Sequence, residues 1–468
     1  MNRLKYLLKN IGIMAIGQFG TKLIGFVMLP LYTSILSTRE YGIYDLLSVT
    51  VSLLLPIVTV TVYEATLRFA MDERKDIKDV FITSNVVLLI GDTVVAVGLI
   101  INYFLGLNTL IKEYSLLLFL MLLLDSISYN LSNFVRGLDK VKEVAVSGII
   151  SSVVVVVSNI LFLVVLRWGI TGFFVSGILG VVSQLLYLFF SGSCYQYIRG
   201  KNDKKLRREM LGYSWPLVAN NVASWITIAS DRYVVTWICG LSISGIYSVG
   251  YKIPSILVVF QSIFNQAWVL SAVKEFDSKD KEAYFTKVYR LYNFGMVVGC
   301  SVLILSTKVL AYYLYSEDFY QAWVYVPLLV ISIVFGSLCS YVGGIFLAVK
   351  DTGIIAKTTL IGATLNIIVD IALVYSIGAM GAAIATVLSY IVIWMMRMIY
   401  VRKYIKLEIK ILRDVFSYLL LIVQTVILLI VPDYAILYPV EMVLLLVIIG
   451  AYMDEIKIVM NRMTRILK

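Results

Sequence analysis

The sequence predicts an all-α integral membrane protein with about fourteen membrane-spanning helices, and three observations predict it. Sixty per cent of the 468 residues are hydrophobic, well above the roughly 45–50% that is typical of soluble domains. These residues gather in blocks of roughly 20, the length a helix needs to cross a bilayer. The charged residues lie mainly in short segments between the blocks, and their density alternates along the chain.

Each apolar block predicts one helix, bounded by a charged turn or by a turn that contains glycine or proline. The first block follows the basic segment MNRLKYLLKN and is too long for the apolar region of a signal peptide, so we expect it to be retained. Six spans precede the basic run RGKNDKKLRR, namely 10–36, 44–68, 80–104, 114–136, 144–166 and 173–192. The other eight are 213–239, 247–272, 289–314, 323–348, 354–375, 382–401, 415–431 and 436–453.

The basic residues occupy alternate loops. One set of loops contains most of the Lys and Arg residues, at 3–9, 74–78, 136–142, 199–208, 274–290, 350–357 and 402–413. The other set holds little beyond Arg39, Lys112, Arg167 and Lys308. Cytoplasmic loops of membrane proteins carry the excess of Lys and Arg, so we expect both termini in the cytoplasm. This sorting explains the net charge of +11 without a nucleic-acid partner.

Short motifs recur at a spacing of about 200 residues and predict an internal repeat. Gly-Ile-Tyr stands at 42–44 and again at 245–247, Gly-x-x-Gly stands at 169–172 and again at 378–381, and Asn159 is matched by Asn366. Six helices per copy keep the two copies parallel, as in parallel-repeat transporters. The predicted units are a six-helix bundle (1–198), a basic cytoplasmic linker (199–212), a second six-helix bundle (213–401) and an appended helix pair with a cytoplasmic tail (402–468).

Several kinds of chemistry are excluded by residues that the chain lacks. It contains no histidine, and its four cysteines are far apart with no CxxC pair, so neither a zinc site nor a redox motif is indicated. No GxxxxGK[ST] run is present, so the chain has no nucleotide-binding P-loop of its own. We therefore expect no catalytic residues, no metal and no cofactor.

Polar residues form stripes at helical spacing in spans one, two, seven and eight, and the stripes include Asn220 and Gln266. Such stripes fit either polar packing between helices or a water-filled cavity. Basic residues inside the spans favour the water-filled cavity, because a charge that faces lipid at mid-membrane costs about 2.5–3.5 kcal/mol. Lys22, Arg232 and Lys252 lie inside spans.

Further charges lie at or near span ends and centres. Arg68 follows Glu64 by four residues near the cytoplasmic end of its span, and this spacing predicts an ion pair. Asp231 next to Arg232 fits either a local structural pair or a site facing a cavity. The acidic residues near span centres are Asp92, Asp125 and Asp370. They fit either neutral acids held by hydrogen bonds or sites of ion coupling.

The segments GTKLIGFVMLPLYTSILSTREYGIYDL (20–46), ATLRF (65–69) and SDRYVVTWICGLSISGIYSVGYKIP (230–254) resemble Wzx-type polysaccharide flippases. These belong to the multidrug/oligosaccharidyl-lipid/polysaccharide exporter superfamily. The resemblance implies two six-helix bundles around a central cavity, with two extra helices, in the inner membrane of a bacterium. It also implies transport of an undecaprenyl-diphosphate-linked oligosaccharide to the outer leaflet by alternating access, for O-antigen, capsule or exopolysaccharide synthesis.

The resemblance further implies a cationic cavity, and Lys22, Arg68, Arg232 and Lys252 fit this expectation, with Asn220 and Gln266 as hydrogen-bonding groups. The expected partners are the lipid-linked oligosaccharide and membrane lipids, with the polysaccharide polymerase and chain-length machinery as further candidates. Because the chain lacks a nucleotide site, an ion gradient is the simplest driving force, and downstream polymerisation is the alternative. Asp92, Asp125 and Asp370 are the candidate coupling residues, because burial near the midplane raises a carboxyl pKa.

Other functions remain open at this point. One alternative is a drug exporter of the MATE type, which has the same fold and usually carries cationic substrates. The acidic residues near the span centres fit this alternative, whereas the basic residues inside the spans argue against it. A lipid II flippase would explain the appended helix pair. A membrane glycosyltransferase or ligase normally uses long external loops, which this chain lacks, and a scaffold would not need charges inside the membrane. Binding of a lipid diphosphate rather than an organic cation distinguishes the main readings.

Overall fold

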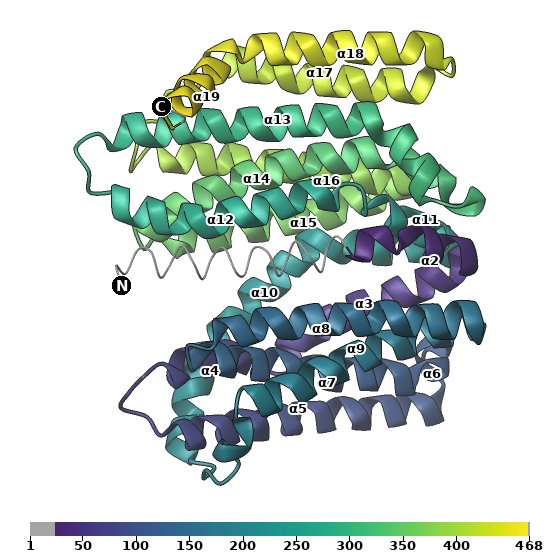
Figure 1. The fold of residues 1–468 in the computed structure, drawn as a ribbon, viewed down its shortest axis with the longest axis vertical. Coiled ribbons are helices and arrows are strands. Elements are labelled where there is room, and N and C mark those ends of the chain that lie inside the picture. The colour runs from purple at the N-terminus through teal and green to yellow at the C-terminus, as the bar shows by residue number, and fades with distance from the viewer. Residues whose placement is uncertain (1–23, 467–468) are drawn as a thin grey trace. The chain divides into compact units, whose positions relative to one another are not determined.

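The computed structural model describes residues 24–466, and every regular element in this range is a helix (Figure 1). The chain divides into two compact units, Met1–Ala229 and Ser230–Lys468. The division falls inside one long helix, α10 (Lys204–Cys239). The prediction of an all-α polytopic membrane protein is confirmed.

The described part of the first unit contains eight numbered helices before α10. They are α2 (Leu29–Ile35), α3 (Thr38–Val58), α4 (Val62–Ala70), α5 (Ile77–Leu105), α6 (Thr109–Glu113), α7 (Ser115–Gly137), α8 (Val141–Asn159), which a π-helical turn (Ile160–Val165) extends, and α9 (Gly169–Ser191), which a 3₁₀ turn (Cys194–Tyr197) follows. The helix α7 packs against α4, α5 and α9, and α8 packs against α9. Phe134, Leu188 and Met210 are fully buried in the core that these helices share with the start of α10.

The second unit contains the remaining helices. They are α11 (Leu241–Gly250), α12 (Ser255–Glu275), α13 (Lys281–Leu314), a 3₁₀ segment (Glu317–Val324), α14 (Val326–Ala348), α15 (Thr352–Ile377), α16 (Ala379–Val401), α17 (Ile411–Ile430), α18 (Tyr434–Ala451) and α19 (Met453–Ile466). The helix α14 is central, because it packs against α12, α13 and α16. The predicted appended pair, α17 and α18, packs against α13 at the edge of the unit (Figure 1). The short helix α19 was not predicted.

Twelve of the described helices are long and apolar enough to cross a membrane. Two of the fourteen predicted spans are not among them. Most of the span 10–36 lies outside the described residues, and its described part forms a short apolar helix, Ile24–Ile35. The span 213–239 lies in α10, which is long but carries many polar residues, including Asn220, Asn221, Asp231 and Arg232. The count of fourteen is therefore approximate, and α10 is the span that composition supports least.

Two predicted spans are interrupted. The span 44–68 is divided between α3 and α4, because Val60 and Thr61 have φ angles of 50° and 55°, which β-branched residues rarely adopt. The hydroxyl groups of Thr59 and Thr61 bond to the carbonyl groups of Leu55 and Pro56 at this break. The span 247–272 is divided between α11 and α12 at residues 251–254. This interruption includes Pro254, which lacks the N–H that a continuous helix requires.

The repeated motifs occupy equivalent places in the two units. Gly169 and Gly378 have φ angles of +57° and +67°, in the region that favours glycine, and each lies at the start of the following helix. A Cβ atom on Gly172 would lie 2.9 Å from the Cβ atom of Phe162, and one on Gly381 would lie 2.4 Å from the carbonyl carbon of Leu373. Each pair of glycines therefore lets a helix turn back tightly on the one before it.

The asparagines of the repeat also make equivalent contacts. Asn159 Nδ2 donates to the hydroxyl of Tyr32, 2.9 Å away, in the first described helix of its unit. Asn366 Oδ1 accepts from the hydroxyl of Ser230, 3.3 Å away, in the part of α10 that belongs to the second unit. Both contacts join the fifth helix of a predicted copy to its first helix. These observations support the predicted repeat.

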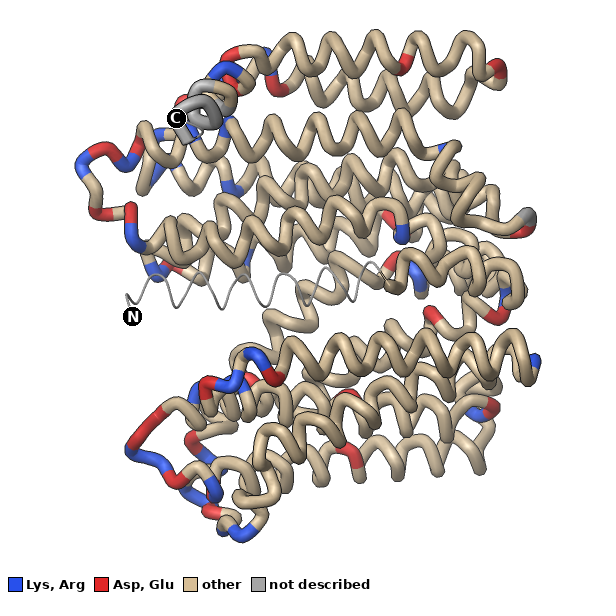
Figure 2. The backbone as a smooth tube through the Cα atoms, in the orientation of Figure 1, with Lys and Arg blue, Asp and Glu red and all other residues tan. Residues whose placement is uncertain are grey.

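In each unit, Lys and Arg gather mainly at one end (Figure 2). In the first unit this end is held by an ion pair between Lys75 and Glu209 and by the backbone N–H of Lys201, which donates to Asp79. The side chain of Arg74 donates to Asp72 in the same loop and holds the pKa of that carboxyl at about 2. The second half of the predicted linker 199–212 is helical, because α10 begins at Lys204.

Candidate functional site

A buried polar cluster of the second unit surrounds Asp231 in α10. Its side chain is 3% exposed. The hydroxyl of Tyr247 in α11 donates to Oδ2 at 2.8 Å, and the hydroxyl of Tyr251 donates to the same oxygen. Arg232 contributes its backbone N–H, which donates to Oδ1 at 2.9 Å. The carboxylate of Asp231 therefore has donors on both oxygens, as a buried charge requires.

Arg232 forms the cationic side of this cluster. Its Nη1 lies 3.3 Å from Asp231 Oδ1, and its guanidinium lies over the ring of Tyr251, 4.2 Å from the centroid. The side chain is 11% exposed. Of the two readings left open by the sequence, the local pair with Asp231 is therefore present.

Asp370 in α15 lies close enough to Asp231 for the two carboxyl groups to interact electrostatically. It is fully buried, and neither of its oxygens has a hydrogen-bond partner among the described residues. Asn366, one turn earlier, bonds instead to Ser230. Tyr247 is also fully buried, in the apolar core that α10, α11, α15 and α16 share. The cluster thus combines a paired carboxylate with an unpaired carboxyl group.

The two candidate acids of the first unit have different surroundings. Asp92 in α5 is 2% exposed and accepts from Ser126 of α7 through Oδ2 at 2.9 Å, while its Oδ1 has no partner among the described residues. Asp125 in α7 is half-buried and interacts electrostatically with Tyr129, one turn later. Among the three candidate coupling acids, Asp370 is the one whose two oxygens are both buried without a hydrogen-bond partner among the described residues.

The other predicted binding residues are distributed between the two units. Lys252 is half-buried in the interruption between α11 and α12, next to the tyrosine on which Arg232 stacks. Gln266 in α12 is half-buried and donates to Ser262 at 3.5 Å. Asn220 in α10 is exposed and belongs to the first unit. Lys22 lies outside the described residues, so the structure gives no account of it.

Arg68 lies at the end of α4 in the first unit and is exposed. The predicted ion pair with Glu64 is wrong, because no salt bridge joins these two described side chains. Glu64 instead interacts electrostatically with Arg136 of α7. The spacing of four residues placed Arg68 and Glu64 on one face of a helix, but a neighbouring helix supplies the charge that acts on Glu64.

Sequence reasoning missed two features. Tyr247 and Tyr251 were not among the candidate residues, although their spacing of one helical turn allows both hydroxyls to reach one acceptor. Arg397 in α16 is 7% exposed and bonds to the carbonyl of Cys339 and the hydroxyls of Thr358 and Thr359. Among the described residues, no cluster of Cys, Asp and Glu could hold a metal ion.

Comparisons with known proteins add to this geometry. The family of polysaccharide biosynthesis proteins matches residues 7–269, more than half of the chain. A Haloferax volcanii protein described as "probable low-salt glycan biosynthesis flippase Agl15" is 21% identical over 213 residues. That match covers 44% of this chain and 45% of the relative, so it spans less than half of the relative's length.

Two solved structures share the fold. The lipid II flippase MurJ, in an inward closed conformation, has a TM-score of 0.68 and 16% identity, over 96% of this chain and 99% of that one. An inward-facing MATE multidrug transporter of the MOP superfamily also has a TM-score of 0.68, with 11% identity over 82% of this chain and 95% of that one. At these identities the similarity shows the fold alone, which is that of a membrane transporter.

Proposed function

Because this chain belongs to the family of polysaccharide biosynthesis proteins, we propose that it is a flippase that carries a lipid-linked oligosaccharide across a membrane. The charged and hydroxylated head of such a lipid cannot cross hydrocarbon unaided, since unpaired charges and polar groups are costly there. The fold shared with transporters supports this proposal. The substrate class we propose is an undecaprenyl-diphosphate-linked oligosaccharide, moved from the cytoplasmic leaflet to the outer leaflet.

The observation that carries the proposal is the buried Arg232 with its neighbour Lys252. A diphosphate needs cationic hydrogen-bond donors to replace its water shell, and charge-assisted bonds from Arg and Lys are the strong ones. Tyr251 fixes Arg232 by stacking, so the guanidinium is held in place before a substrate arrives. Arg68, Asn220 and Gln266 are proposed as further contacts, and Lys22 as another.

Asp370 is proposed as the residue that couples transport to an ion gradient. A carboxyl group with no hydrogen-bond donor is far less costly to bury when neutral than when charged, so conformations that hydrate Asp370 would favour release of its proton. Asp92 and Asp125 remain weaker candidates, because Asp92 already accepts a hydrogen bond and Asp125 is half-buried. We propose a bacterial inner membrane location with both termini in the cytoplasm, and a polymerase with chain-length machinery as downstream partners.

The test is a transport assay with purified protein in liposomes. A fluorescent lipid-diphosphate oligosaccharide is placed in both leaflets, and a membrane-impermeant quencher reports which leaflet holds it. We expect translocation by the parent chain and its loss in Lys252→Ala, with normal activity in Lys274→Ala, an exposed lysine at the end of α12. Binding of an organic cation without any binding of the lipid diphosphate would instead support the MATE-type alternative.

The lipid II flippase remains a second candidate because MurJ covers 96% of this chain, including the appended helices. The same assay distinguishes the two, with lipid II and a lipid-diphosphate oligosaccharide that lacks the peptide as competing substrates. Preference for lipid II would favour that candidate. Equal transport of several glycans on one lipid diphosphate would favour recognition of the diphosphate itself.

A further inference from the structure

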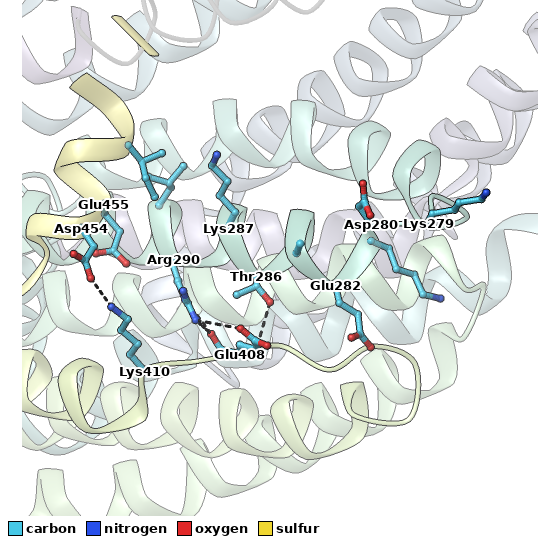
Figure 3. A pocket seen from close by; sticks show the side chains of 14 residues that line it. Lys279, Asp280, Glu282, Thr286, Lys287, Arg290, Glu408, Lys410, Asp454 and Glu455 are labelled. Atoms are coloured by element: carbon cyan, nitrogen blue, oxygen red, sulfur yellow. Dashed lines mark hydrogen bonds and ion pairs between the residues drawn. The ribbon is translucent and has the colours of Figure 1, made fainter. Parts of the chain in front are cut away.

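A cavity of about 670 Å³ lies in the second unit, at the end where Lys and Arg gather (Figures 2 and 3). It is framed by the first turns of α13, by the segment that leads into α17, and by the start of α19. Its volume falls within the range of roughly 300–1,000 Å³ that is usual for small-molecule sites. None of the proposed transport residues lines it.

The cavity carries cationic groups on α13. Lys287 is half-buried and forms no ion pair with any described carboxylate. Arg290, three residues later, donates through Nε and Nη2 to the backbone carbonyl of Glu408, at 2.9 and 2.5 Å (Figure 3). The carboxylate of Glu408 is 85% exposed and lies 3.8 Å from the same guanidinium. The charge of Lys287 is thus uncompensated, and that of Arg290 is only weakly compensated.

The other side of the cavity is acidic. Asp454 is paired with Lys410 at 2.6 Å, and this hydrogen bond holds the pKa of Asp454 below its usual range (Figure 3). Glu455 is paired with Arg413 through Oε1 at 2.6 Å, and its side chain is 2% exposed. The second oxygen, Oε2, is buried without a hydrogen-bond partner among the described residues. A buried carboxylate oxygen of this kind is costly unless a donor reaches it.

The residues that line the cavity are therefore complementary to a ligand that has both an anionic group and a hydrogen-bond donor. Lys287 and Arg290 suit a phosphate, and Glu455 Oε2 suits an ammonium group. Leu291 and Ile458 supply an apolar side, which suits a hydrocarbon chain. Basic pockets between helices at the cytoplasmic membrane surface are a recurrent way to bind lipid headgroups.

We propose that this cavity binds a phospholipid with a phosphoethanolamine headgroup. The phosphate lies against Lys287 and Arg290, and the primary ammonium donates to Glu455 Oε2. Lipid in this position joins α13 to α19 and so fastens the appended helix pair to the bundle. This site is separate from the Asp231 cluster, and it does not depend on the proposed transport function.

The test uses the purified full chain in detergent, stripped of lipid. The unfolding temperature is followed during titration with short-chain phosphatidylethanolamine, phosphatidylcholine, phosphatidylglycerol and inorganic phosphate. We expect an apparent affinity for phosphatidylethanolamine about tenfold or more above that for phosphatidylcholine, whose quaternary ammonium cannot donate a hydrogen bond. Phosphatidylglycerol, which has no ammonium, should bind less tightly than phosphatidylethanolamine.

Two variants and a control locate the effect. Lys287→Ala should lower the apparent affinity for every lipid about tenfold, whereas Lys274→Ala should leave all of these affinities unchanged. Glu455→Gln also loses part of its ion pair with Arg413, so its readout is the ratio of two lipids on the same variant, and we expect the preference for phosphatidylethanolamine to disappear. Equal affinities for the two zwitterionic lipids in the parent chain, unaltered binding in Lys287→Ala, or equal stabilisation by inorganic phosphate would each overturn the proposal.

Discussion

Removal of Arg232 tests how the Asp231 cluster is held together. In Arg232→Ala the carboxylate of Asp231, 3% exposed, loses its cationic partner at 3.3 Å. Breaking a buried ion pair on one side costs about 3–5 kcal/mol. The hydroxyls of Tyr247 and Tyr251 still donate to Oδ2, so we expect a loss near the lower end, about 3 kcal/mol. A variant with both charges removed, Asp231→Asn/Arg232→Gln, should recover more than half of this loss.

The free energy of unfolding is measured by reversible denaturant titration in mixed micelles, on the parent, the single variant and the double variant. Lys274→Ala is the control, and we expect it to lie within about 0.5 kcal/mol of the parent, as is usual for exposed positions. Binding of a lipid diphosphate is measured on the same samples. We expect binding to be lost in both Arg232 variants, although only the single variant is strongly destabilised.

The reasoning is refuted if Arg232→Ala unfolds at the same free energy as the parent, because Asp231 would then not depend on this cation. It is also refuted if the double variant is no more stable than the single one. A double variant that is stable and still binds the lipid diphosphate would separate the two roles, leaving the ion pair structural and removing Arg232 from the proposed substrate site.

Three further predictions concern packing, coupling and orientation. Gly381→Ala places a Cβ atom 2.4 Å from the backbone of α15 and should lower the free energy of unfolding by about 1–3 kcal/mol. Gly295→Ala, with open space around it, should be neutral or stabilising. Equal unfolding temperatures for the two variants would contradict the packing argument. Asp370→Asn keeps the shape and removes titration, so transport in liposomes should lose its dependence on an imposed proton gradient, and an unchanged dependence would exclude this residue. Cysteines placed at Lys201 and Arg39 should label from opposite sides of the membrane; labelling from one side contradicts the orientation.

The predicted helices agree closely with the structure wherever composition alone sets their limits. The spans 80–104 and 114–136 correspond to α5 and α7, because an unbroken apolar block has no other stable form in a bilayer. The turns at the GxxG motifs, 169–172 and 378–381, could also be predicted, because each turn depends on a few residues that are close together in the sequence. The interruptions at 59–61 and 251–254 were not predicted, because the apolar residues on either side of each one are close enough to be taken as a single span.

Only some residues of the Asp231 cluster could be selected from the sequence. Arg232, Lys252 and Asp370 could be selected because a charge inside a membrane span is costly and needs a reason. Their partners could not be selected in this way. Tyr247 and Tyr251 lie one helical turn apart in span eight, but nothing in the sequence indicated that the two hydroxyls share one oxygen of Asp231. The predicted pair of Glu64 with Arg68 failed for the same reason, since the charge that acts on Glu64 comes from Arg136 on another helix.

The sequence by itself determined the class of protein, most of its spans, the repeat and the presence of charges that must be accommodated within the membrane. These depend on composition and on spacing along one helix, which act locally. Which charges are paired and which are left over, as with Asp231 against Asp370, was settled only by the tertiary structure. Pairing depends on distances between atoms of different helices, and a shift of one helical turn would exchange the partners without any change in hydropathy.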